Sequence, residues 1–254
     1  MPFIDLGEDK LFYSAHDQDA RRNLVCVHGA AADHRVWPAG LGDIPDCNTW
    51  LPDLPGHGRS GGPPPERLDD HVEAISAFID ALDLDNVVLA GHSMGGAIVQ
   101  ALALKYPDCP QALILACTGA RVENMDELME LIRHDFDSAV ERLTFASFAP
   151  GAPGALVEAY RAHLLDVGAQ TCLADFTAWG SFDATRHLHQ ITQRTLVISG
   201  DIDRMTPLKH AQFLEDRMPD ARLAVIAPAG HQLPLEQPDD MVYQIHDFMA
   251  RTHG

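Results

Sequence analysis

The sequence predicts an α/β fold with a doubly wound, mostly parallel sheet of eight strands and a helical cap inserted after the sixth strand. Short apolar runs alternate with helical patterns over residues 1–119 and again over residues 191–254. This alternation is typical of parallel strands that are covered by helices on both faces. Between these parts, residues 120–190 contain helical patterns without intervening strands. We therefore expect a core in two parts, 1–119 and 191–254, and a cap over 120–190.

Apolar runs bounded by turn residues predict the individual strands. Runs rich in Val, Leu and Ile suit strands that are buried on both faces, whereas the first segment, around Tyr13, suits a short strand at the sheet edge. The segment around Trp50 is a weaker strand. The predicted strands cover residues 10–14, 23–27, 49–53, 86–90, 112–116, 195–199 and 222–226.

Apolar residues at helical spacing predict the helices. Four of them cover the core, at residues 68–82, 96–104, 207–217 and 239–251. Four more follow one another in the predicted cap, at residues 124–134, 137–147, 153–167 and 170–179. Asn124 with Glu127 is the expected start signal of the first cap helix.

A serine lies at the junction between a predicted strand and a predicted helix. Residues 91–95 read Gly-His-Ser-Met-Gly, after the apolar run 86–90 and before the helical pattern 96–104. A chain that changes from strand to helix within about one residue must hold Ser93 in a strained conformation and present its hydroxyl at the carboxyl end of the sheet. The helix N-terminus there favours a developing oxyanion. The pentapeptide alone is equally consistent with an ordinary tight turn, so its function depends on the rest of the chain.

The loops after two later strands carry the groups that a reactive serine requires. A serine hydroxyl needs a base within hydrogen-bond reach, and the base needs an orienting acid. In an open α/β sheet these groups lie beyond the carboxyl ends of strands. The strand 195–199 is followed by Asp201 and Asp203, and the strand 222–226 is followed by a loop that reaches His231. The sequence thus predicts a catalytic serine, aspartate and histidine in that order.

Together these segments resemble the α/β-hydrolase fold superfamily, of the capped, single-domain esterase type. Five ordered motifs carry the resemblance, which covers almost the whole chain: His28-Gly29, residues 53–60 (DLPGHGRS), residues 91–96 (GHSMGG), residues 200–203 (GDID), and Gly230-His231 followed by Glu236 and Pro238. Arg194 departs from the family, whose members often have proline there, and this departure touches no catalytic residue. Residues 120–190 match no family pattern, so the substrate stays open.

The resemblance implies a role for each motif residue. Ser93 resembles the nucleophile, His231 the general base and Asp203 the orienting acid, while Asp201 is the rival acid whose alternative role is to cap its turn. The backbone N–H groups of Met94 and Ala30 are the expected oxyanion hole. His28 and His57 lie in family loops and are expected to brace them.

Four side chains, two near these motifs and two in the predicted cap, are candidates for substrate binding. Trp37 follows the oxyanion loop, and His92, beside the serine, is expected to be a pocket wall or a hydrogen-bonded support. Phe145 and Trp179 belong to the aromatic residues of the predicted cap, which are Phe136, Phe145, Phe148, Tyr160, Phe176, Trp179 and Phe182. Most of these aromatics are expected to form the cap's core, and two or three to line an apolar acyl or alcohol pocket.

Composition excludes several classes of function. The chain has 254 residues with 37 Asp and Glu against 18 Lys and Arg, a net charge of −19, which disfavours nucleic acids and anionic membrane surfaces. Residues 1–10 do not read as a signal peptide, and no apolar run reaches the roughly 18 residues of a membrane helix. Five scattered cysteines favour free thiols in the cytoplasm. The spacing of the histidines, such as His187 and His189, predicts no metal site.

These observations favour hydrolysis of small or medium carboxylic esters through an acyl-enzyme. No cofactor is expected, the partner is a small-molecule substrate, and the protein is expected to be a monomer or homodimer. The same residues would also serve a lactonase, a thioesterase or a hydrolase of carbon–carbon bonds in β-diketone-like substrates. A cofactor-free peroxidase activity and a non-catalytic ligand receptor are weaker alternatives. Haloalkane dehalogenases and epoxide hydrolases of this fold fit less well, because they have aspartate in place of Ser93.

Overall fold

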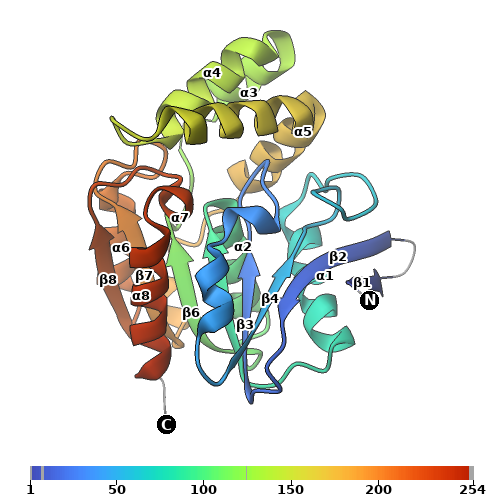
Figure 1. Ribbon diagram of the computed structural model, residues 1–254, viewed down its shortest axis with the longest axis vertical. Helices are drawn as coiled ribbons and strands as arrows, with labels where there is room; N and C mark the ends of the chain where they lie inside the picture. The colour runs from blue at the N-terminus through green and yellow to red at the C-terminus, as the bar shows by residue number, and fades with distance from the viewer. Residues whose placement is uncertain (1, 7–8, 124, 252–254) are drawn as a thin grey trace.

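The apolar runs form the centre of an eight-stranded sheet in the computed structural model, which describes residues 2–6, 9–123 and 125–251 (Figure 1). The strand order is β1-β2-β4-β3-β5-β6-β7-β8. β2 is antiparallel to both of its neighbours, and the other neighbouring strands are parallel. The strands are β1 (Phe3–Leu6), β2 (Asp9–His16), β3 (Arg22–Val27), β4 (Cys47–Pro52), β5 (Val87–His92), β6 (Pro110–Ala116), β7 (Arg194–Gly200) and β8 (Ala221–Ile226). The predicted fold class is confirmed.

Two layers of helices cover the sheet because successive residues of a strand point to opposite faces. In β5, for example, Val87 and Leu89 pack in one hydrophobic cluster, and Val88 and Ala90 pack in the other. The first cluster lies under α1 (Leu68–Ala81), α2 (Met94–Lys105) and α6 (Leu208–Arg217), and the second under α8 (Pro238–Ala250). Short helical turns complete the connections: η1 (His34–Val36), η2 (Ala39–Asp43), η3 (Leu188–Gln190) and α7 (Leu233–Glu236).

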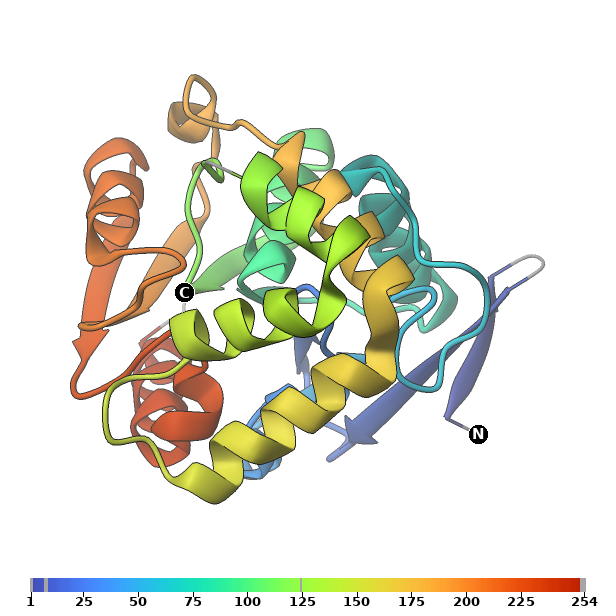
Figure 2. The same cartoon turned by 90° about the horizontal axis from the view of Figure 1, so that it is seen from above.

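Three helices follow β6 and lie across the end of the sheet at which the parallel strands terminate (Figures 1 and 2). They are α3 (Asp126–His134), α4 (Phe136–Ser147) and α5 (Gly154–Gly180), and all lie within the segment 120–190. α5 contains both of the helices predicted from 153 to 179, separated by Gly168, whose φ of 84° and ψ of 165° are not helical. Asn124, the expected start signal, lies outside the described residues. Within the described chain, no helix is both long and apolar enough to cross a bilayer.

The junction between β5 and α2 has the strained geometry that the sequence predicts. β5 ends at His92 and α2 begins at Met94, so a single residue reverses the chain, and Ser93 has φ 55° and ψ −119°. The reversal brings α2 against the end of β3. A Cβ at Gly95 would lie 2.5 Å from the backbone oxygen of His28 and closer still to that of Val27. Glycine at position 95 is therefore a packing requirement of the turn.

We expect Gly95→Ala to destabilise the protein, because the added methyl group must displace backbone rather than a mobile side chain. Overpacking of this kind should lower the free energy of unfolding by about 1–3 kcal/mol. Gly154→Ala is a matched control, since its Cβ would meet no atom within 4 Å and should be neutral or stabilising by up to about 1 kcal/mol. Urea denaturation of both variants tests this expectation, and equal stabilities would contradict it.

Candidate active site

Three loops at the carboxyl ends of the strands bring Ser93, His231 and Asp203 together. The Nε2 atom of His231 lies 2.9 Å from Ser93 Oγ, and its Nδ1 atom lies 2.9 Å from Asp203 Oδ2. All three side chains are buried. A carboxylate only accepts hydrogen bonds, so Nδ1 carries the proton and Nε2 is left to accept the hydrogen bond from the serine hydroxyl. This arrangement enables the ring to remove the serine proton.

Asp203 is held as a carboxylate by the turn in which it lies. It accepts hydrogen bonds from the backbone N–H of Met205 (2.9 Å), from the N–H of Thr206 (2.8 Å) and from the Thr206 hydroxyl (2.8 Å). Burial alone would raise the pKa of Asp203, but the adjacent His231 and these hydrogen bonds outweigh burial and lower it. The rival residue, Asp201, instead accepts the Ala229 N–H at 3.0 Å and so joins the two loops. The structure thus brings Asp203, not Asp201, to His231.

The two backbone donors expected to stabilise an oxyanion lie on either side of the Ser93 turn. Met94 is the first residue of α2, so no carbonyl within the helix can accept its N–H. The loop that carries Ala30 passes close to the turn, since a Cβ built on Gly29 would lie 2.9 Å from the Cβ of Ser93. Among the described residues, no acceptor takes the Ala30 N–H. Both donors are therefore available beside Ser93.

A small cavity lies next to Ser93, and it shares lining residues with a larger one. The first has a volume of about 10 Å³, enough for about one water molecule. The second measures about 230 Å³, is lined mainly by apolar groups, and shares Ala32, Tyr160 and Gln232 with the first. Besides Ser93, His231 and residues 29–32, the small cavity is lined by His92, Leu143, Tyr160, Leu164, Phe176, Trp179, Met205 and Gln232.

Two of the four predicted pocket residues line this cavity. Trp179 of α5 lies against it, as do Tyr160 and Phe176, so three of the aromatic residues in segment 120–190 line the cavity beside Ser93. His92 also lines the cavity, and its Nε2–H donates to the backbone oxygen of His231 at 2.9 Å. Burial and then the neighbouring His231 lower the pKa of His92 to about 3, so His92 is a neutral support.

The other two predictions, Trp37 and Phe145, are corrected by the structure. The Trp37 side chain is only 5% exposed and packs in the hydrophobic cluster between the sheet and α8, because the chain turns its indole toward the core after η1. Phe145 is 72% exposed on α4, and the Arg204 guanidinium lies 4.6 Å from the centre of its ring. Neither residue lines the cavity beside Ser93.

Sequence analysis missed several lining residues. Gln232 directly follows His231, and Met205 follows Asp203 by two residues, so their closeness to the motifs could have indicated them. Leu143 of α4 and Leu164 of α5 carry no such signal, because an apolar residue of a helix is as well suited to packing as to lining a pocket.

A buried ion pair lies behind the loop that carries Ala30. His57 Nδ1 is 3.0 Å from the Pro55 carbonyl oxygen, and its Nε2 is 2.8 Å from Asp175 Oδ2. Both partners are acceptors, so the ring donates from both nitrogens and is an imidazolium. Burial alone would lower the pKa of His57, but Asp175 outweighs it and raises the pKa. His57 braces its loop as expected, whereas sequence analysis did not identify Asp175.

His28 braces the same region in the neutral state. Its Nε2 accepts the Leu54 N–H, and its Nδ1–H donates to the Gly29 carbonyl, both at 2.9 Å. Burial and then the nearby His57 lower the pKa of His28 to about 4. His28 therefore connects the loop after β3 to the loop after β4 without adding charge.

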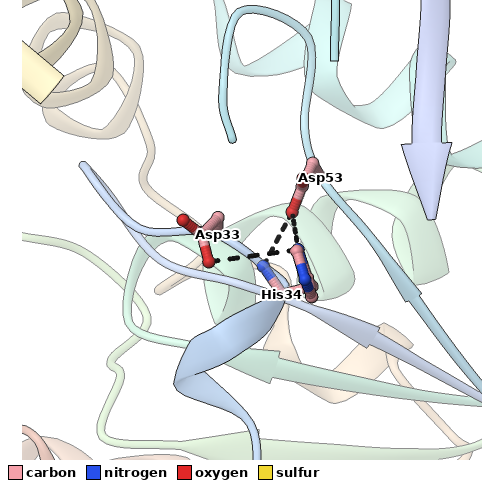
Figure 3. A group of neighbouring side chains, drawn as sticks. All are labelled: Asp33, His34 and Asp53. Atoms are coloured by element: carbon pink, nitrogen blue, oxygen red, sulfur yellow. Dashed lines mark hydrogen bonds and ion pairs between the residues drawn. The ribbon is translucent and has the colours of Figure 1, made fainter. Parts of the chain in front are cut away.

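One group of described residues brings three potential metal ligands within 4.8 Å of one another: Asp33, His34 and Asp53 (Figure 3). Their atoms are already used by hydrogen bonds. Asp53 Oδ1 accepts from the backbone N–H and the Nδ1–H of His34, both at 2.7 Å, and Asp53 Oδ2 accepts the Arg59 N–H. Asp33 holds the Arg35 side chain. These residues therefore join the loop after β3 to the loop after β4, which is a structural role.

Comparison with known proteins places this geometry among hydrolases. Residues 24–244 match the model of the family described as the alpha/beta hydrolase family. A 2-hydroxy-6-oxo-2,4-heptadienoate hydrolase of Pseudomonas putida is 26% identical, over 92% of this chain and 91% of that protein. A pimeloyl-(acyl-carrier protein) methyl ester esterase of Nitrosomonas europaea is 25% identical, over 87% and 92%. The fold of an esterase from Exiguobacterium antarcticum matches with a TM-score of 0.87 at 21% identity, over 94% and 95%.

We expect Asp203→Asn to slow the reaction of Ser93 with a fluorophosphonate by about 10²-fold or more, because the amide no longer orients His231 or stabilises its charged form. Asp201→Asn is the matched control, since it alters a carboxylate of the same turn that does not touch His231; it should mainly lower stability. The labelling rate of Ser93, followed by mass spectrometry, measures both effects. The opposite ranking would assign the acid to Asp201.

The His57–Asp175 pair should make stability depend on pH. His57 has a folded-state pKa above its unfolded value of 6.5, so its contribution is complete below about pH 6.5 and is lost as the pH rises through the folded pKa. Asp175→Asn removes the pair. The difference in unfolding free energy between wild type and this variant should therefore shrink from pH 6 to pH 9 in urea denaturation. A difference that stays constant would show that His57 is neutral.

Proposed function

This chain belongs to the alpha/beta hydrolase family, and we propose that it is a serine hydrolase that cleaves carboxylic esters of small or medium size through an acyl-enzyme. One observation carries the proposal: two hydrogen bonds of 2.9 Å connect Asp203 to His231 and His231 to Ser93. The backbone of Ser93 is strained, and Ser93 lines the small cavity. An unreactive serine has no need of either the strain or the oriented base.

In this mechanism each group has one task. As Ser93 Oγ attacks the ester carbonyl carbon, its proton passes to Nε2 of His231, and ionised Asp203 stabilises the resulting imidazolium. The carbonyl oxygen becomes an oxyanion that accepts hydrogen bonds from the N–H groups of Ala30 and Met94. Collapse of this intermediate breaks the bond to the alcohol, which leaves with the proton from Nε2. Water, deprotonated by His231, then attacks the acyl-enzyme and releases the acid and Ser93.

We assign the helices of segment 120–190 the role of a cap that sets the substrate range. Helices α4 and α5 contribute side chains to the wall of the cavity beside Ser93, and such a cover excludes water and shapes the pocket. The space beside Ser93 holds about one water molecule, so an ester requires the cap to move outward or its side chains to rearrange. The adjoining apolar cavity of about 230 Å³ suits an acyl or alcohol chain.

The same residues would serve related substrates. A lactone, a thioester, and a carbon–carbon bond next to a carbonyl group each pass through an oxyanion that Ala30 and Met94 would bind. The similarity to an esterase acting on a pimeloyl-(acyl-carrier protein) methyl ester favours open-chain esters. The similarity to a 2-hydroxy-6-oxo-2,4-heptadienoate hydrolase makes dienoates the alternative substrates to test. A non-catalytic receptor is distinguished by fluorophosphonate, which labels Ser93 only when His231 activates it.

We expect Ser93→Ala to lower kcat by roughly 10³-fold or more, because only substrate binding and the oxyanion hole remain. The measurement is hydrolysis of p-nitrophenyl esters of increasing chain length, beside lactones, acyl-CoA thioesters and a 2-hydroxy-6-oxo-dienoate, with circular dichroism to confirm the fold. Ser93→Ala that retained a tenth of the wild-type rate would exclude Ser93 as the nucleophile.

Trp179→Ala should shift the preference toward longer acyl chains, because it removes the indole from the wall of the small cavity. A change of one or more methylene groups in pocket size should alter relative kcat/KM between short and long esters by about 10-fold or more. Phe145→Ala is the matched control, since this aromatic residue belongs to the same segment but lies on the surface. Equal chain-length profiles for wild type and both variants would place specificity in the core loops instead.

A further inference from the structure

A buried aspartate of α5 contacts the loop that carries Ala30, and the mechanism above does not use it. Asp175 is fully buried, and its Oδ2 atom accepts the Ala31 N–H at 2.6 Å and the Nε2–H of His57 at 2.8 Å. Ala31 is the residue after the proposed oxyanion donor. Two other residues of the last turns of α5, Phe176 and Trp179, line the cavity beside Ser93, so Asp175 lies directly behind the site.

Burial of the Asp175 carboxylate removes its charge from water, which lowers the stability of the fold unless the charge is paired. An unpaired buried charge strongly destabilises a protein. Here the charge is compensated by His57, which is protonated on both ring nitrogens. The other titratable groups that face His57 are His28 after β3, His71 of α1, and Asp53 after β4. One oxygen of the carboxylate, Oδ1, has no hydrogen-bond partner among the described residues, so the Oδ2 contacts account for the orientation of the side chain.

Ala31 itself is held in a conformation that its side chain does not favour. Its φ is 50°, in the left-handed region that a residue with a Cβ adopts at a cost. Both sides of the residue are bound to α5. The N–H donates to Asp175, and the carbonyl oxygen accepts from the Nε2–H of His163 at 3.0 Å. His163 and Asp175 lie on opposite sides of the break at Gly168, so both halves of the helix hold Ala31.

We propose that α5 positions the oxyanion hole. Asp175 and His163 hold Ala31 in its left-handed conformation, and this directs the adjacent Ala30 N–H toward the developing oxyanion. The inference rests on the proposed serine hydrolase function. It makes Asp175 and His163 positioning residues, since neither donates to the reacting oxygen. It also couples the helical segment to catalysis, because the Ala30 N–H is aligned only while α5 contacts Ala31.

The test compares Asp175→Asn and His163→Ala with wild type by two measurements. The first is the split between kcat and KM for a p-nitrophenyl ester. The second is the affinity for a trifluoromethyl ketone, which forms an oxyanion on Ser93, against the affinity for an alcohol of the same chain length, which does not. Loss of one oxyanion donor lowers kcat by about 10²–10³-fold, and partial misalignment should give about 10-fold or more.

We expect kcat and the trifluoromethyl ketone affinity to fall in parallel in both variants. In Asp175→Asn, KM and the alcohol affinity should change by less than about threefold. His163 also lines the larger cavity, so in His163→Ala the expected result is a larger fall in ketone affinity than in alcohol affinity. His163→Gln should recover much of the loss, because its amide can still donate to the Ala31 carbonyl. Glu215→Gln is the matched control, since it also removes a carboxylate that accepts a backbone N–H, that of Leu223, but away from the site. If Asp175→Asn fails to fold, His163→Ala and His163→Gln carry the test.

Two results would overturn the inference. One is that folded Asp175→Asn and His163→Ala retain wild-type kcat. The other is that ketone and alcohol affinities fall equally, which would indicate a general loss of structure. Failure of the proposed function is a distinct result, because wild type itself would then neither hydrolyse esters nor react with a fluorophosphonate at Ser93.

Discussion

The passage from β5 to α2 through a single residue is the constraint on which the rest of the site depends. It forces Ser93 into a left-handed conformation and leaves no space for a Cβ at Gly95 or Gly29. The same turn places Ser93 beyond the end of β5, directly before the N-terminus of α2. Strain of this kind persists only where the surrounding structure enforces it, and here the enforcing structure is the buried β3–β5–β6 centre of the sheet.

Parallel strands determine where the other groups lie. Since β5, β7 and β8 run in the same direction, the loops after them meet at one edge. Asp203 and His231 thereby reach Ser93 across separations of more than a hundred residues in sequence. The cost of burying the Asp203 carboxylate is offset locally, because its own turn supplies two N–H donors and a hydroxyl. The parallel sheet thus places Ser93, His231 and Asp203 together, and the turn around Asp203 stabilises the charge of that carboxylate.

The helical segment adds a second buried charge system to the first. Asp175 comes from the segment and His57 from the core, and their pairing joins α5 to the loop after β4, while the same carboxylate oxygen accepts the Ala31 N–H of the loop after β3. Residues of α5 line both the small cavity beside Ser93 and the larger apolar cavity, and α5 also holds the loop at Ala31. Helix α5, which contributes side chains to the wall of the cavity beside Ser93, therefore also contacts the loop that carries Ala30.

The sequence by itself determined seven of the eight strands, the longer helices and the three motif residues, because hydrophobic periodicity and strand–turn–helix punctuation are local properties of a chain. It missed β1, and the strand around Tyr13, predicted for the sheet edge, lies between β1 and β4 because β1 pairs with it. Even the break at Gly168 was visible as a gap between two helical patterns. It also favoured Asp203 over Asp201 through a family motif, and the hydrogen bonds agree. Tertiary structure decided what depends on the direction of a side chain. Trp37 and Phe145 are aromatic residues of the kind that line pockets, yet Trp37 is buried in the core and Phe145 is exposed to solvent. Asp175 and His57 are 118 residues apart, and an isolated aspartate in a helical pattern gives no sign of its partner. Packing of α5 against the loop after β4 brings the two together, and no local pattern encodes that contact.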